Sequence, residues 1–516
     1  MKTPESPGTS KARLSSLAFA LGLALSIAAS SPALAQAAEG AQACAALARP
    51  HAFAHTLVSS AKEVAESAAE HLPAFCEVTA VISPERGSRI GVVYRLPEGW
   101  NGKMLGLGGG GWAGDTKIRT AAEGLARGYA TAQTDAGHVS TTVWDTSWAR
   151  NPESRKDFSY RAVHLMTLVG KEVIASHYGR RETRAYFQGC STGGRQALME
   201  VQRFPQDYDG VTAGAPVYGL LTQSSGLLRN RTFTAPGAAL SPAQLERLNA
   251  AALAACDAAD GVKDGIVTDP RRCGFDPGVL ECRAATASAD CLTKAQVAAV
   301  RRVYGGVRTS DGQIAAYPLA RGSEAGWSRF LSVSAAQRRP GASDSGGGMS
   351  GLREALFGDA GFDLLRFDPD RDLKRMRTSA FARMYEARDA DLSAFVARGG
   401  KLILWHGFYD PGPSPLGTIG YYERVLRTSG AKTRTVADSV RLFILPGVYH
   451  CRGGPGADRF DALSAIEEWV GHDRPPAHLV ATRNDGKLSR PLCAYPQLPH
   501  YRGSGDPNEA ASFECR

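Results

Sequence analysis

A serine flanked by glycines is the strongest candidate for chemistry in this sequence. Ser191 has Gly189 two residues before it and Gly193 two residues after it. Small neighbours are needed where a nucleophile sits on a strained turn between a strand and a helix, because the helix must pass close to the strand. Residues 184–188 are typical of a buried strand and residues 195–201 of a helix, so the context favours such a nucleophile elbow over an ordinary connection.

A serine hydroxyl at its ordinary pKa is a poor nucleophile and needs a histidine base, which a carboxylate orients. Where an elbow carries the serine, the chain order is serine, acid, histidine. Asp410 follows the apolar run 401–405 and His450 follows the apolar run 441–445, so we predict Asp410 as the acid and His450 as the base. The alternative for Asp410 is a residue that caps a turn. The other histidines are expected to lie on the surface or outside the required chain order. His406 precedes the acid, and the others lie in polar or Pro-rich sequence: His472, His478 and His500.

Two cysteines support this pairing, because Cys190 directly precedes Ser191 and Cys451 directly follows His450. If the serine and the histidine share a hydrogen bond, their neighbours can lie within the Cα separation of a disulfide, roughly 4.4–6.8 Å. We therefore predict a bridge that ties the elbow to the histidine loop. The alternative is that both cysteines pair elsewhere.

A tetrahedral intermediate also needs hydrogen-bond donors for its oxyanion. The backbone N–H of Thr192 supplies the first donor, and the glycine run 108–111, after the strand-like residues 104–107, can supply the second. A phosphate-binding loop is the competing interpretation of these glycines. It is disfavoured because the Lys-Ser/Thr of a Walker A motif does not follow.

Residues 256–266 place three carboxylates in eleven residues, at Asp257, Asp260 and Asp264, with glycines that permit a tight wrap. Hard oxygen ligands suit calcium, but the spacing departs from an EF-hand, which ends in a bidentate glutamate. The chemistry of the residues alone leaves a solvated acidic turn equally open. Cys256 and Cys273 could close the loop around an ion.

The N-terminus indicates export. A basic start, an apolar stretch over residues 14–29 and the small-x-small site 33–35 predict a signal peptide over residues 1–35; a membrane anchor is disfavoured because the apolar run is short. Ten cysteines without a CxxC pair then favour disulfides over metal or redox sites. The net charge of +9 comes from scattered arginines, so we expect neither a nucleic-acid nor a membrane partner. The location is expected to be extracellular or periplasmic.

The elements that must position these residues come in two blocks. From residue 90 to 216 strand-like runs alternate with helical patterns, which is typical of a mostly parallel sheet. Residues 218–397 are richer in Gly, Pro, Asp and paired Cys, and strand signals return at 401–405 and 441–445. We predict an α/β fold with an α/β-hydrolase core, formed by residues 36–217 and 398–516. A large inserted lid domain, which contains the acidic segment, spans residues 218–397.

Several motifs together resemble the tannase/feruloyl esterase family, which includes feruloyl esterases, tannases and a bacterial mono(2-hydroxyethyl) terephthalate hydrolase. The resemblance covers nearly all of the mature chain. It rests on the glycine loop, the elbow and the acidic segment, and on these further runs: 100–102, 203–205, 214–216, 406–410, 421–424 and 450–456.

The resemblance implies a Ser191–Asp410–His450 triad, the Cys190–Cys451 bridge, and oxyanion donors at Thr192 and Gly111. It also implies a structural calcium ion held by the three aspartate carboxylates and by the Val262 and Ile266 carbonyls. Four further disulfides match family pairs: Cys44–Cys76, Cys256–Cys273, Cys282–Cys291 and Cys493–Cys515.

The expected activity is hydrolysis of aromatic acid esters, with feruloyl or hydroxycinnamoyl and galloyl esters equally supported. Two departures weaken a terephthalate monoester substrate: the terephthalate enzyme of the family carries Glu where this chain has Thr192, and an aromatic residue where it has Pro413. Three alternatives stay open: hydrolysis of the terephthalate monoester, acyl transfer to another alcohol, and a non-catalytic phenolic-binding role for the same fold. The sequence predicts no oligomeric state.

Overall fold

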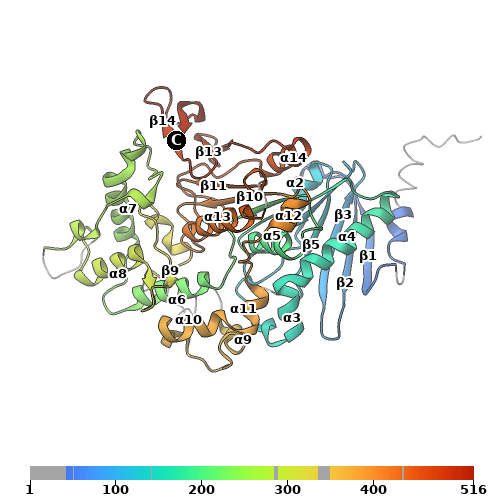
Figure 1. Ribbon diagram of the computed structural model, residues 1–516, viewed down its shortest axis with the longest axis horizontal. Coiled ribbons are helices and arrows are strands. Elements are labelled where there is room, and N and C mark those ends of the chain that lie inside the picture. The colour runs from blue at the N-terminus through green and yellow to red at the C-terminus, as the bar shows by residue number, and fades with distance from the viewer. Residues whose placement is uncertain (1–41, 50–51, 141, 284–288, 335–348, 433–434) are drawn as a thin grey trace, which may run out of the picture. The chain divides into compact units, whose positions relative to one another are not determined.

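The apolar runs expected as strands join one sheet of nine strands, shown in the computed structural model of Figure 1. The structure describes residues 42–49, 52–140, 142–283, 289–334, 349–432 and 435–516. The strand order is β1-β2-β3-β5-β4-β6-β7-β10-β11. The strands span Thr56–Val64 (β1), Phe75–Ile82 (β2), Ile90–Pro97 (β3), Lys103–Leu107 (β4), Ala130–Thr134 (β5), Arg184–Cys190 (β6), Gly210–Gly214 (β7), Lys401–Gly407 (β10) and Val440–Leu445 (β11).

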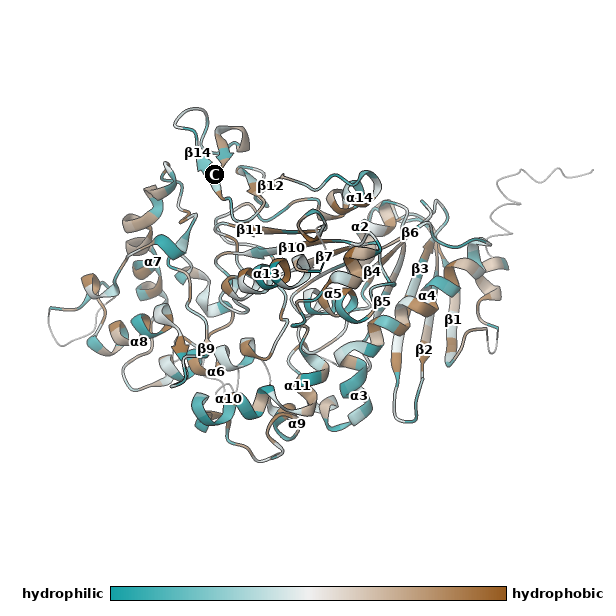
Figure 2. Ribbon diagram, viewed as in Figure 1, coloured by the Kyte–Doolittle hydropathy of each residue, from teal (hydrophilic) through white to brown (hydrophobic). Residues whose placement is uncertain are grey.

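The strands from β5 to β11 in this order pair in parallel, whereas β2 pairs antiparallel with β1 and with β3, and β3 pairs antiparallel with β5. Parallel strands are covered on both faces and therefore read as near-continuous apolar runs. Figure 2 shows hydrophobic residues along β10 and β11. The predicted mostly parallel sheet is confirmed, with an antiparallel extension at its N-terminal edge.

Helices cover both faces of the sheet because successive side chains of a strand point to opposite sides. Phe187 and Leu404 belong to the same apolar cluster as helices α4 and α5, whereas Tyr186 and Ile403 belong to a second cluster with α2 and α14. The helices that cover the sheet outside the inserted segment include α2 (Ile118–Ala126), α3 (Pro152–Lys156), α4 (Ala162–Tyr178), α5 (Thr192–Arg203), α13 (Pro415–Gly430) and α14 (Ala462–His472).

The chain between β7 and β10, which is the inserted segment, contains the helices α6 to α12. Residues Ala41–Arg516 form one compact unit. Helices α9, α10 and α11 of this segment lie together (Figure 1). The sheet is thus interrupted and resumed as expected, while the exact lid boundaries stay a prediction. The segment contains α6 (Leu221–Thr234), α7 (Pro242–Cys256), α8 (Lys294–Gly305), β8 (Val307–Arg308), β9 (Ile314–Ala316), α9 (Arg353–Phe357), α10 (Pro369–Arg377), α11 (Ala380–Tyr385) and α12 (Ser393–Ala397).

Two short hairpin-like pairs follow the sheet at the C-terminal end. Strand β12 (His478–Thr482) pairs with β13 (Ser489–Cys493), and β14 (Pro499–Tyr501) pairs with β15 (Phe513–Cys515). All ten cysteines form the five disulfides that the resemblance implied. The predicted signal peptide, residues 1–35, lies outside the described residues. Within the described part of the chain no helix is long and apolar enough to cross a bilayer.

Candidate active site

Ser191 occupies the turn between β6 and α5 with a backbone φ of 65° and ψ of −121°. A positive φ is strained for a residue with a side chain, and it is the conformation expected of a nucleophile elbow. The Ser191 amide donates to the Gly214 carbonyl at 2.9 Å, and its own carbonyl accepts from Arg195 at 3.0 Å and Val217 at 3.1 Å. Three elements therefore hold the serine in the strained turn.

The flanking glycines are required by close approach. A Cβ on Gly189 would lie 2.5 Å from backbone atoms of Gly193, and a Cβ on Gly108 would lie 2.5 Å from the Gly193 Cα. Any larger residue would push the helix off the strand or the glycine loop off the helix. Close steric contact therefore explains why the predicted elbow and the glycine loop have glycines at these positions.

The glycine loop is fixed to α5 by two side chains. Thr192 Oγ1 donates to the Gly111 carbonyl at 2.5 Å, and Gln196 Oε1 accepts from the Gly109 amide at 2.9 Å. Thr192 and Gln196 are four residues apart and so share one helix face. Among the described residues, the amides of Gly110 and Gly111 donate to no protein acceptor. The loop can therefore present a free N–H beside the elbow.

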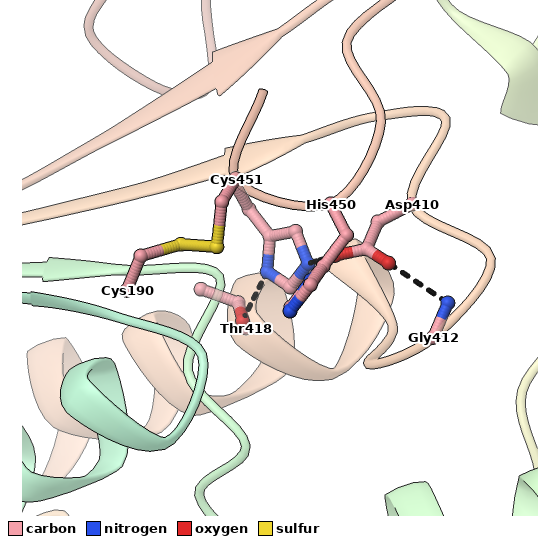
Figure 3. Close-up of a disulfide and its surroundings, with 7 residues drawn as sticks. Cys190, Asp410, Gly412, Thr418, His450 and Cys451 are labelled. Atoms are coloured by element: carbon pink, nitrogen blue, oxygen red, sulfur yellow. Dashed lines mark hydrogen bonds and ion pairs between the residues drawn. A yellow bond between two sulfur atoms is a disulfide. The ribbon is translucent and has the colours of Figure 1, made fainter. Parts of the chain in front are cut away.

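Asp410 and His450 meet as the chain order predicts. His450 Nδ1 lies 2.6 Å from Asp410 Oδ2, and the Gly412 amide donates to Asp410 Oδ1 at 2.8 Å (Figure 3). Asp410 follows β10 and His450 follows β11, neighbouring parallel strands whose carboxyl ends meet at one edge of the sheet. The sheet itself therefore brings these two groups together.

A second imidazole shares the carboxylate. His406 Nε2 lies 3.0 Å from Asp410 Oδ2, and His406 Nδ1 lies 2.8 Å from Thr418 Oγ1. The His406 side chain is fully buried. An ionised Asp410 accepts a hydrogen bond from His406 Nε2–H. In the neutral His406 ring, Nδ1 then accepts a hydrogen bond from the Thr418 hydroxyl. One carboxylate oxygen thus has two N–H donors.

These contacts decide the charge of the acid. Burial alone raises the pKa of Asp410, but the charges and hydrogen bonds of His450 and His406 outweigh it and lower the pKa to about 2. Asp410 is therefore ionised at any pH at which His450 can act as a base. Its Nδ1 contact leaves His450 Nε2 as the ring nitrogen available for the serine proton.

The disulfide Cys190–Cys451 joins the elbow to the histidine loop, with a Cα–Cα distance of 6.1 Å (Figure 3). Ser191 and His450 then line one cavity of about 560 Å³, together with the glycine loop and with Phe330 of the inserted segment. The Phe330 ring packs edge-on against His450, with ring centroids 5.0 Å apart. The structure thus brings the predicted nucleophile, base and oxyanion loop to one cavity, with the predicted acid behind the base.

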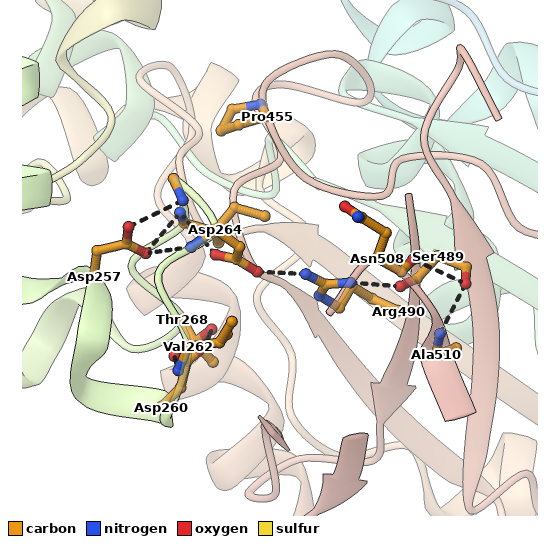
Figure 4. A network of polar contacts seen from close by, with 12 residues as sticks. Asp257, Asp260, Val262, Asp264, Thr268, Pro455, Ser489, Arg490, Asn508 and Ala510 are labelled. Atoms are coloured by element: carbon orange, nitrogen blue, oxygen red, sulfur yellow. Dashed lines mark hydrogen bonds and ion pairs between the residues drawn. The ribbon is translucent and has the colours of Figure 1, made fainter. Parts of the chain in front are cut away.

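The acidic segment forms a loop whose carboxylates accept from its own backbone (Figure 4). The Asp257 carboxylate accepts from the amides of Asp264 at 3.3 Å, Gly265 at 3.0 Å and Ile266 at 3.1 Å. The Asp260 carboxylate accepts from the Val262 amide at 3.2 Å and from the Thr268 hydroxyl. Asp257, Asp260 and Asp264 are the carboxylates that the resemblance named, whereas Val262 and Ile266, named for their carbonyls, contact these carboxylates through their amides.

Asp264 also pairs with Arg490 of β13 (Figure 4). Burial raises the pKa of Asp260 and Asp264, and hydrogen bonds to the carboxylates partly oppose this effect. Repulsion from neighbouring aspartates raises the pKa further. Among the described residues the three carboxylates are not gathered within 4.8 Å of one another. The donor set nevertheless fits a hard divalent cation in type, since buried and mutually repelling carboxylates are the groups that such an ion neutralises.

Known proteins were compared with the chain as a whole. A family model described as "Tannase and feruloyl esterase" matches residues 76–516. The chain belongs to this family. A mono(2-hydroxyethyl) terephthalate hydrolase from Piscinibacter sakaiensis is 34% identical, over 87% of this chain and 86% of that protein. A probable feruloyl esterase from Arthroderma benhamiae is 32% identical, over 83% of this chain and 82% of that protein.

Solved structures of the tannase/feruloyl esterase family share the fold. The crystal structure of feruloyl esterase B from Aspergillus oryzae has a TM-score of 0.81 and 26% identity, and it covers 92% of this chain and 100% of its own. Tannin acyl hydrolase from Aspergillus niger, with a TM-score of 0.74 and 22% identity over 92% and 94% of the two chains, supports the fold. The α/β-hydrolase-type architecture is confirmed, and this family member is a carboxylic ester hydrolase.

Two residues around the site were not predicted. His406 precedes the acid and therefore does not fit the chain order of a base, but its spacing of four residues from Asp410 is consistent with a second partner. Gln196 was read only as part of a helix, although it lies one turn after Thr192 on the face toward the glycine loop. Each of the two contacts a part of the site that the sequence does predict, His406 the acid and Gln196 the glycine loop. Neither belongs to a sequence motif of its own.

Proposed function

We propose that this esterase is exported and hydrolyses esters of aromatic acids, hydroxycinnamoyl or galloyl, with Ser191 as nucleophile, His450 as base and Asp410 as the orienting acid. The observation that carries the proposal is the Asp410–His450 pair at 2.6 Å, tethered by the Cys190–Cys451 disulfide to the residue next to Ser191. Five disulfides support an oxidising compartment, periplasmic or extracellular.

The proposed reaction has two steps. His450 Nε2 takes the Ser191 proton as Oγ attacks the ester carbonyl carbon, and the oxyanion accepts hydrogen bonds from the amides of Thr192 and Gly111. The imidazolium then gives its proton to the leaving alcohol, and an acyl-enzyme remains. Water, deprotonated by His450, attacks the acyl carbon and releases the acid and Ser191. Asp410 stabilises the imidazolium in both steps without itself taking a proton.

The nucleophile is tested with p-nitrophenyl acetate and methyl ferulate. Ser191→Ala is expected to lower kcat by about 10⁴-fold or more, as for other triad members. Ser59→Ala, on the exposed side of β1, is the matched control and should keep full activity. Unchanged turnover in Ser191→Ala would exclude the serine mechanism.

Substrate identity requires a panel, because relatives of this chain carry different substrate names. Methyl ferulate, methyl gallate, chlorogenate and mono(2-hydroxyethyl) terephthalate are compared by kcat/KM. We expect the terephthalate monoester to be the poorest, since Thr192 and Pro413 depart from the enzyme that uses it. Added alcohols separate a hydrolase from an acyltransferase, because only in the latter do they compete effectively with water for the acyl-enzyme.

We also propose a structural calcium ion in the acidic loop, held by the carboxylates of Asp257, Asp260 and Asp264 with the carbonyls of Val262 and Ile266. The ion would neutralise buried carboxylates remote from the catalytic cavity and take no part in the reaction. Prolonged treatment with EDTA should lower the Tm, and added Ca²⁺ should restore it. An unchanged Tm after EDTA would contradict a structural ion.

A further inference from the structure

A second cavity, of about 400 Å³, adjoins the catalytic one. Thr222 of α6 and Pro413 of the loop after Asp410 line both cavities, so the two share a wall. Its volume lies within the range of small-molecule sites. Three guanidinium groups face it, and one carboxylate: Arg377, Arg388, Arg424 and Glu386.

The charges in this cavity do not cancel. Glu386 Oε2 pairs with Arg388 Nε at 2.7 Å, and Glu386 Oε1 accepts from the Leu220 amide at 3.0 Å. The two other arginines have neutral partners: Arg377 Nη1 donates to Gln313 Oε1 at 3.4 Å and Arg424 Nη1 to the Gly420 carbonyl at 3.0 Å. Among the described residues neither forms an ion pair. With three guanidinium groups and one carboxylate, the cavity holds an excess of two positive charges.

The arginines also repel one another. Burial, followed by the charge of Arg388, lowers the pKa of Arg377, although the charge of Glu386 opposes this. Half-buried like charges are unfavourable unless an anion lies between them. Ser414 of the cavity wall is a further candidate donor, since its Oγ is buried and has no hydrogen-bond partner in the part of the chain that the structure describes. A planar carboxylate matches this set, because guanidinium groups bind it through paired hydrogen bonds.

The position of the cavity indicates which part of an ester reaches it. His450 must protonate the leaving oxygen, so the alcohol part lies on the histidine side of Ser191. Pro413 belongs to the loop that begins at Asp410, the partner of His450. The cavity behind Pro413 therefore borders the alcohol side rather than the oxyanion loop.

We propose that this second cavity is a subsite for a carboxylate carried by the alcohol part of the ester. The preferred substrates are then aromatic acid esters of hydroxy acids. This inference rests on the proposed ester hydrolysis at Ser191. It adds to it a specificity for negatively charged leaving alcohols.

The test compares chlorogenate, whose alcohol part carries a carboxylate, with the neutral ester methyl caffeate, which has the same acyl group. The ratio of their kcat/KM values is measured for wild type, Arg377→Met, Arg424→Met and the double variant. We expect the ratio to fall at least tenfold in the double variant. Arg366→Met, an exposed arginine of the same inserted segment, is the charge-matched control and should keep the wild-type ratio.

Two measurements keep the inference testable if the arginine variants fold poorly. In wild type, high salt should lower the chlorogenate to methyl caffeate ratio, because an ionic contact is screened. Calorimetry should show quinate binding to Ser191→Ala, and binding should be lost when Arg377→Met and Arg424→Met are added.

Three results would overturn the inference: an unchanged ratio in the double variant, no quinate binding, or a loss confined to mono(2-hydroxyethyl) terephthalate, whose carboxylate is on the acid side. Quinate binding alone, with an unchanged ratio, would mean an anion site unrelated to the substrate. If wild type hydrolyses neither ester, the proposed substrate class fails, and the calorimetry still decides whether the cavity binds a carboxylate.

Discussion

At Asp410 a single carboxylate oxygen accepts from two imidazoles. His450 Nδ1 approaches Oδ2 to 2.6 Å and His406 Nε2 to 3.0 Å, while the Gly412 amide satisfies Oδ1. A buried carboxylate with these donors stays ionised, and it holds the His450 ring in one orientation. Thr418 in turn orients His406 through its hydroxyl. His406 is thus a positioning residue that acts through Asp410.

Replacing His406 tests this role. His406→Phe keeps a ring in the buried site but removes one donor to Asp410, so the pKa of the carboxyl rises from about 2. Asp410 then takes up its proton at a higher pH than in wild type, and the acid limb of the kcat/KM profile should shift to higher pH. We expect kcat/KM to fall between about tenfold and a hundredfold at neutral pH, as for small displacements of catalytic groups.

Thr418→Val is the graded control, because it keeps the His406 donor and removes only the hydroxyl that orients it. It should give a smaller shift in the same direction. An acid limb identical to wild type in His406→Phe would show that His450 alone sets the ionisation of Asp410.

The residues proposed for catalysis were predictable because each has a local signature. Ser191 stands between glycines that steric contact requires, and Asp410 and His450 each follow an apolar strand. His406 could not be assigned in the same way, because its role depends on the position of Asp410 in the folded chain. The sequence showed which residues could do chemistry, but not how many of them share one partner.

At the level of elements, the Cys190–Cys451 disulfide joins the turn after β6 to the loop after β11. These strands are not neighbours in the sheet, since β7 and β10 lie between them. The bridge therefore fixes a distance that strand pairing does not fix directly. It also closes a loop with a sequence separation of 261 residues.

Removing this bridge should impair catalysis as well as stability. In the chain-entropy model such a loop contributes about 5 kcal/mol to the free energy of unfolding. Beyond a lower Tm, we expect Cys190→Ala/Cys451→Ala to lower kcat by about ten- to a hundredfold, because the base is no longer held against the nucleophile.

The control is Cys493→Ala/Cys515→Ala, which removes a bridge between β13 and β15 away from the catalytic cavity. It should lower the Tm and keep kcat. Equal losses of kcat in both double variants would mean that the elbow bridge has only the general effect of a cross-link.

Over the whole molecule, the sequence predicted the interrupted sheet but not its strand order. The apolar runs 184–188, 401–405 and 441–445 became β6, β10 and β11 because continuous apolar runs suit strands buried on both faces. The antiparallel strands β1 and β2 precede the region expected to form the sheet. The order β3-β5-β4 depends on which helices cross which face, and no single segment encodes it.

The inserted segment holds a buried carboxyl at Glu324. It accepts from the Gly322 amide at 3.0 Å and from the Tyr304 hydroxyl, and burial raises its pKa to about 7. Unfolded, this glutamate loses its proton near pH 4.5. Between these two pH values the folded chain binds more protons, so its stability falls as the pH rises through this window.

Glu324→Gln should remove this pH dependence. The free energy of unfolding lost by wild type across the window is up to about 3 kcal/mol for a shift of this size. Asn249 lies beside Glu324 and can turn its amide to donate to the carboxylate or to accept from a glutamine, so the variant keeps its partners. We therefore expect the Tm of Glu324→Gln to match wild type near pH 4.5 and to exceed it by a few degrees at pH 8. The exposed Glu354→Gln is the control and should show no pH-dependent difference. A Tm difference between Glu324→Gln and wild type that is the same at both pH values would contradict a buried glutamate that keeps its proton.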